Sequence, residues 1–153
     1  MFFNTADVAL LTDAPERTLD QWFRDKVVEP TVNARKGQSR RFVAVDVLAV
    51  TLLVSLRNAK IGSLEAGRAI AKLIQSHTEA ELVAKFARGQ KFILLIGDDV
   101  IPDLLAEKVV FDKEMKKQAS AAGIHPIAIN LEVAYKSLQE KVVALVDASR
   151  KGE

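Results

Sequence analysis

The stretch that decides the fold runs from Thr5 to Ile70, TADVALLTDAPERTLDQWFRDKVVEPTVNARKGQSRRFVAVDVLAVTLLVSLRNAKIGSLEAGRAI. Its beginning predicts two short helices, over residues 5–11 and 16–23, joined by a turn at residues 12–15. Thr5 is a candidate N-cap, and Pro15 suits the beginning of a helix, where its missing N–H costs no hydrogen bond. A basic loop centred on Gly37 follows, and residues 44–58 then predict a long apolar helix.

Two short helices followed by a cationic hairpin are the layout of a winged helix-turn-helix. Leu19, Trp22 and Phe23 are expected to face the core from the second helix. Residues 31–42 predict a hairpin with Gly37 near its tip, which would form the wing. In this layout the second helix enters the DNA major groove and the wing lies along the backbone or minor groove.

The rest of the chain predicts a helix over residues 63–75, another over 79–86, and three short strands over 91–96, 109–111 and 127–129. The strands could build a small sheet. Residues 131–150 predict a final helix in which leucines recur every seven residues. Such a narrow heptad stripe favours pairing with another helix, while packing onto its own domain is the alternative. The stripe consists of Leu131, Tyr135, Leu138, Val142 and Leu145.

Composition excludes several classes of protein. The 153 residues carry a net charge of +2, so any case for nucleic acid depends on where the cations cluster. The chain has no cysteine, which excludes disulfides and thiolate metal sites, and its apolar runs are too short for a membrane span. His77 and His125 lie in no metal or nucleophile motif, and the acidic residues 98–103 lack calcium-site spacing. We expect a cytoplasmic, nucleoid-associated protein that is no enzyme and has no cofactor.

Residues 5–70 resemble the DNA-binding domain of the MerR family. The family pattern of the second helix, a threonine-leucine pair, an aromatic residue, an apolar pair and a proline, is matched by Thr18-Leu19, Trp22, Val27-Val28 and Pro30. The end of the wing and the opening of the long helix are matched by Arg41-Phe42 and Asp46, and the next turn by residues 60–64.

The resemblance implies dimerisation through the C-terminal helix, but it carries over no effector site. RNA polymerase and a small-molecule effector are further partners that it allows. Two positions depart from the family. Asp20 stands where an arginine near the phosphates is usual, and a carboxylate there would be repelled by DNA. Asp13 stands where the turn usually has glycine, a mild change because aspartate tolerates turn conformations.

The residues expected to contact DNA divide into two groups. On the second helix, Arg17 could bond a guanine edge bidentately, while Thr18 and Gln21 suit base or phosphate contacts. Cations on the wing would add affinity that is independent of sequence, by counterion release. The whole set is Arg17, Thr18, Gln21, Arg24, Arg35, Lys36, Arg40 and Arg41.

The sequence thus predicts a mainly α, α+β fold in three segments: a winged-helix DNA-binding domain over residues 1–75, a linker or small sensor or partner segment over 76–130, and a dimerisation helix over 131–150. The main functional hypothesis is a homodimeric transcription regulator that binds a pseudo-palindromic site on double-stranded DNA. Two alternatives stay open. One is an excisionase-like or architectural DNA-binding protein, and the other is a protein-interaction module that has lost DNA contact, as Asp20 would suggest.

Overall fold

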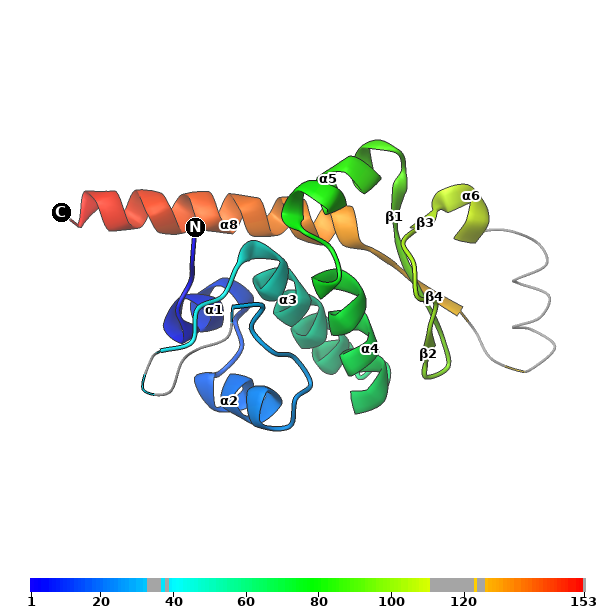
Figure 1. Ribbon diagram of the computed structural model, residues 1–153, viewed down its shortest axis with the longest axis horizontal. Helices are drawn as coiled ribbons and strands as arrows, with labels where there is room; N and C mark the ends of the chain where they lie inside the picture. Colours follow the sequence, from blue (N-terminus) through cyan, green and yellow to red (C-terminus); the bar gives the residue numbers. More distant parts are fainter. Residues whose placement is uncertain (33–36, 38, 111–122, 124–125, 153) are drawn as a thin grey trace.

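The chain folds into helices and one small antiparallel sheet, so the α+β class is confirmed (Figure 1). The computed structural model describes residues 1–32, 37, 39–110, 123 and 126–152. In chain order its elements are α1 (Thr5–Thr12), α2 (Glu16–Arg24), α3 (Ala44–Ala59), α4 (Leu64–Gln75), α5 (Glu79–Ala87), β1 (Gln90–Ile96), β2 (Asp99–Val100), β3 (Leu105–Ala106), α6 (Glu107–Val110), β4 (Pro126–Asn130) and α8 (Leu131–Lys151).

The helices of the N-terminal half surround α3, which is buried along most of its length. Helix α1 begins after Asn4, whose side chain accepts from the Asp7 N–H while the Asp7 carboxylate accepts from the Asn4 N–H, a capping box. The prediction of Thr5 as the N-cap is therefore wrong by one residue. The turn to α2 places Asp13 at φ 60°, the left-handed conformation that aspartate tolerates.

The segment between α2 and α3 is closed at its base by one antiparallel bridge, which joins Val32 to Arg41. A second antiparallel bridge joins the next residue, Phe42, to Phe3, which precedes α1. Gly37 has φ 85°, a conformation that glycine adopts at little cost. The pairing at the base agrees with the predicted hairpin, but most of its tip lies outside the described residues, and so do Arg35 and Lys36.

The sheet lies at the end of the molecule beyond α4 and α5 (Figure 1). Strand β1 is central, with β4 along one side and both β2 and β3 along the other, all antiparallel. The predicted strands at 91–96 and 127–129 are confirmed. The strand predicted at 109–111 is wrong for Val109 and Val110, which belong to the short helix α6; Phe111 lies outside the described residues.

Helix α8 runs back from the sheet along the N-terminal helices (Figure 1). Its first half is buried through Leu131, Tyr135 and Leu138, which belong to one core together with residues of α1 to α5 and β1. All three predicted segments therefore share a single hydrophobic core. No helix in the described part of the chain combines the length and hydrophobicity needed to cross a membrane.

Candidate nucleic-acid interface

Helix α2 is fixed to the body of the protein by one face. Leu19, Trp22 and Phe23 are buried, as the sequence predicts, and Phe23 stacks on Phe42 with ring centroids 5.1 Å apart. Because these side chains recur at helical spacing, the opposite face of α2 is left to solvent. The helix is therefore held rigidly while its outer face stays available.

The outer face of α2 carries a stripe formed by Arg17, Gln21 and Arg24, which are all exposed. Their spacing of four and three residues places them on one side of a helix. In the described structure neither arginine makes a side-chain hydrogen bond or an ion pair. The amide of Gln21 donates to Asp25 at 2.9 Å, so it would have to change partner to read a base.

Two further guanidinium groups reach α2 from neighbouring segments. Arg40, at the base of the hairpin, forms an ion pair with Asp20 at 3.3 Å and lies 5.0 Å from the centre of the Phe23 ring. Arg57, in the last turn of α3, donates to the Thr18 hydroxyl at 3.0 Å. The exposed face of α2 is thus bordered by one cation on each of these two segments.

The Asp20–Arg40 pair gives the unexpected carboxylate a partner within the protein. A carboxylate alone at this position would repel a phosphate, whereas a paired one has much of its charge compensated locally. Both side chains are about half exposed, so the pair contributes little to stability and can exchange partners readily. Arg41 does not join it, because its guanidinium lies 5.2 Å from the centre of the Phe2 ring instead.

The base of the hairpin is anchored by Asp46, a fully buried carboxylate in the first turn of α3. It accepts hydrogen bonds from the Thr31 N–H and hydroxyl, from the Val43 N–H at 3.0 Å, and from the Gln75 amide at 2.7 Å. One side chain thereby ties both ends of the hairpin segment to α3 and α4. The sequence marks Asp46 as the residue that opens α3, but not as this anchor.

The arginines that sequence reasoning missed are Arg57 and Arg68, both from helices that it treated as core. Arg68 donates to the Asp25 carbonyl at 3.0 Å and pairs with Glu65, so it braces the end of α2. No sequence signal pointed to either residue, because their closeness to α2 arises only when α3 and α4 pack together. Within the described residues, the cluster around the outer face of α2 is Arg17, Arg24, Arg40 and Arg57.

The described residues offer little to other kinds of site. They contain no group of three or more histidine, aspartate or glutamate side chains that could hold a metal ion. His77 is buried, with Nδ1 2.9 Å from the Leu73 carbonyl and Nε2 2.8 Å from the Lys85 ammonium. Its ring joins α4 to α5, which is a structural role.

The residues of the predicted heptad stripe lie in two different environments. Leu131, Tyr135 and Leu138 are buried inside the chain itself, so they are not free to meet a partner. Val142 and Leu145 are only partly buried against the same core. The first half of the stripe therefore packs onto its own chain, which is the alternative that the sequence left open.

Comparison with known proteins adds no identification: the chain matches no protein-family model and has no significant match among curated proteins.

Proposed function

We propose that this protein is a homodimeric, sequence-specific DNA-binding regulator of transcription, of the MerR-like winged-helix type. The observation that carries the proposal is that α2 has one buried face and one exposed cationic face. Its apolar face is locked into the core, while Arg17 and Arg24 extend from the other face without a partner in the described structure. Arginines held on a rigid helix are suited to reading guanine edges in the major groove.

The surrounding cations support the same function. Arg40 and Arg41 lie at the base of the hairpin and Arg57 lies beside Thr18, so phosphates on either side of a groove-bound α2 would meet a guanidinium. Contacts of this kind orient a protein on DNA without reading its sequence. We assign base reading to Arg17, and to Gln21 once it leaves Asp25, and phosphate contact to the flanking arginines.

The acidic side chains of the same face favour a second candidate, a protein-interaction module that has lost DNA contact. Glu16, Asp20 and Asp25 are exposed on or beside α2, and Asp20 engages one of the nearby cations. An architectural, excisionase-like protein is the third candidate, because it would use the same surface without a symmetric site.

One experiment separates the three candidates: selection of bound duplexes from a random library at near-physiological salt. A motif with twofold symmetry is the expected result, because a dimer with two recognition helices reads a site that mirrors its own symmetry. Binding without symmetric enrichment would favour the architectural protein. Failure to retain any DNA would contradict both DNA-binding candidates and favour the interaction module.

Variants then test the residue roles on the selected site. Arg17→Ala should relax base preference at one position, at a cost of about 1–3 kcal/mol in discrimination. Arg40→Ala with Arg41→Ala should weaken binding to every sequence and lower the log–log salt slope by about 0.9 for each phosphate that is no longer bound. Arg88→Ala, which removes an exposed cation from the far end of α5, is the matched control. Equal losses on specific and random duplexes for Arg17→Ala would refute base reading.

A further inference from the structure

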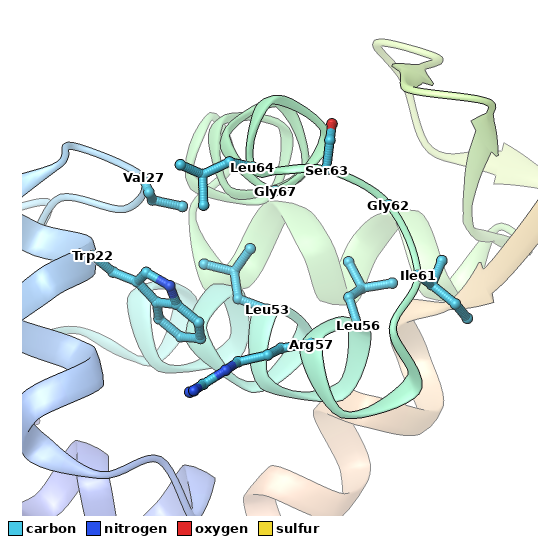
Figure 2. Close-up of a pocket in the computed structure, with 10 residues that line it drawn as sticks. All are labelled: Trp22, Val27, Leu53, Leu56, Arg57, Ile61, Gly62, Ser63, Leu64 and Gly67. Carbon is cyan, nitrogen blue, oxygen red and sulfur yellow. The ribbon is translucent and has the colours of Figure 1, made fainter.

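A cavity of about 270 Å³ lies between the end of α2, α3 and the beginning of α4 (Figure 2). This volume is slightly below the range of about 300–1,000 Å³ that is typical of ligand pockets, so it suits a small molecule. Most of the wall is apolar, and the polar lining groups belong to Trp22, Arg57 and Ser63. The apolar wall consists of Val27, Leu53, Leu56, Ile61, Gly62, Leu64 and Gly67.

Trp22 supplies a hydrogen-bond donor to the lining of this cavity. Its side chain is 8% exposed, yet the indole N–H makes no hydrogen bond within the described part of the chain. Because no fully buried side-chain nitrogen there lacks a partner, the indole nitrogen keeps some accessible surface. Figure 2 shows it on the edge of the ring that is turned toward the other lining residues.

Arg57 supplies a cation to the lining of the same cavity. Its side chain extends along the floor of the cavity toward Trp22 (Figure 2). Its guanidinium donates one hydrogen bond, to Thr18, and it forms no ion pair with the described residues. A guanidinium has five N–H donors in a planar fork, so most of its capacity is unused. The Ser63 hydroxyl already accepts from the Ala66 N–H as the cap of α4.

We propose that this cavity binds a small apolar carboxylate. The lining offers a cation and an unpaired N–H donor but no acidic side chain, so its charge is complementary to an anion and opposed to an amine. A branched hydrocarbon body would pack on Leu53, Leu56 and Ile61. Its carboxylate would accept from Arg57 and from the Trp22 indole. This assignment does not depend on DNA binding.

The chain contains one tryptophan, so its fluorescence reports on the surroundings of Trp22, which include this cavity. The experiment is a titration of the full chain, without DNA, with isocaproate, with the neutral amide of isocaproate, and with acetate. We expect a saturable change in emission with isocaproate and binding about tenfold weaker or worse for the other two probes, because one lacks the charge and the other lacks the apolar body.

Variants identify the binding groups. Arg57→Gln should weaken isocaproate binding about tenfold, and Arg57→Lys should fall between Gln and wild type, because a lysine keeps the charge but loses the fork. Arg88→Gln, an equal charge change outside the cavity, should leave it unaffected. Calorimetry on Trp22→Phe, checked for folding by circular dichroism, should show weaker binding of isocaproate.

Three outcomes would overturn the proposal. Equal binding of isocaproate and its amide would mean that the cavity recognises only hydrocarbon. Equal binding of acetate would mean an adventitious anion site. An absence of saturable change with all three probes, together with no heat in calorimetry, would mean that no such ligand binds.

Discussion

At the scale of single residues, Asp46 is the side chain on which the hairpin depends most directly. It is fully buried and accepts from the backbone and hydroxyl of Thr31, from the Val43 N–H and from the Gln75 amide. A buried carboxylate of this kind is stabilising only while all its donors stay paired, because each orphaned group carries a desolvation cost.

Asp46→Ala should therefore lower the free energy of unfolding by about 3 kcal/mol or more, since several buried donors lose their acceptor together. Asp46→Asn, which keeps one acceptor oxygen, should lose less. Urea unfolding followed by circular dichroism measures both. Asp98→Ala, at an exposed turn, should stay within about 0.5 kcal/mol of wild type. Equal stability of the Asp46→Ala and Asp98→Ala proteins would contradict the anchoring role.

Tyr135 is the residue whose titration the fold changes most clearly. Burial, followed by a 2.7 Å hydrogen bond to Glu79 and the charge of that carboxylate, raises the pKa of the phenol to about 12. The folded state therefore holds this proton more tightly than the unfolded state, whose tyrosine titrates near pH ~10. The resulting stabilisation, about 3 kcal/mol, is complete below pH ~10 and is lost as the pH rises toward 12.

Because the chain has one tyrosine, tyrosinate absorbance follows this group alone. After rapid pH jumps, which are read before unfolding occurs, the native midpoint should lie near 12, against about 10 in denaturant. Glu79→Gln should lower the native midpoint without bringing it to the denatured value, because burial is the larger cause. A native midpoint equal to the denatured one would contradict the buried Tyr135–Glu79 contact.

Residue-level prediction from sequence succeeded where a side chain acts through local spacing. Leu19, Trp22 and Phe23 are buried because helical periodicity alone places them on one face. It failed where a partner comes from a distant segment. The pairing of Asp20 with Arg40, and the contact of Arg57 with Thr18, depend on how the hairpin and α3 pack against α2.

At the scale of elements, the contact between α2 and the hairpin determines how Asp20 would act in the proposed DNA complex. Asp20→Asn should strengthen DNA binding and steepen its salt dependence, because it removes a negative charge and releases Arg40 to a phosphate. The loss of an exposed ion pair should cost at most about 1 kcal/mol in stability. Fluorescence anisotropy over a series of salt concentrations measures the slope.

Asp98→Asn is the matched control, since it removes an exposed carboxylate from the turn after β1. It should leave both affinity and slope unchanged. If Asp20→Asn weakens binding instead, the pair would be holding Arg40 in a productive position. The Asp20 carboxylate would then be a positioning group for Arg40 of the hairpin.

The elements that the sequence predicts best are those with long and regular hydrophobic patterns. Helix α3 has a long apolar pattern and helix α4 a shorter amphipathic one, both longer than a typical strand, and they appear close to their predicted bounds. Val109 and Val110 were predicted as strand from β-branched character, which is a weak preference in a short segment. There the chain forms one helical turn directly after β3, and Val110 is buried from that turn.

At the scale of the whole molecule, α8 shows what a heptad stripe can and cannot determine. The stripe indicates that one face of the helix packs against another element, but it does not indicate whether that element belongs to the same chain. Its first half is covered by α3, α5 and β1 of the same chain, with Tyr135 against Phe86. The second half extends along α1, where Lys141 reaches the Leu11 carbonyl and Asp13. We place the partner contacts of the proposed dimer in this second half.

The turns from Val142 to Ala148 contain a single charged residue, Asp147. Val143 is 60% exposed, and Leu10 of α1, on the helix alongside, is 66% exposed. Glu140, Val143 and Arg150 lie at helical spacing on one face of α8, the face opposite Leu145. If two copies pair antiparallel through this face, centred at the level of residue 145, Glu140 of each copy comes opposite Arg150 of the other, so the charges at both ends would be complementary. This surface is the one on which we place the proposed twofold contact.

Val143→Lys should therefore give folded monomers, because it places a charge on the contact without touching the core. Leu138→Lys should instead unfold the chain. Leu138 is 3% exposed, so a lysine ammonium at this position would be buried without water or a counterion. Light scattering gives the mass and circular dichroism gives the fold. A wild-type protein that is already monomeric would refute the dimer. A Val143→Lys protein that remains dimeric would move the contact to another face, and the two recognition helices of the pair would then need a different arrangement on DNA.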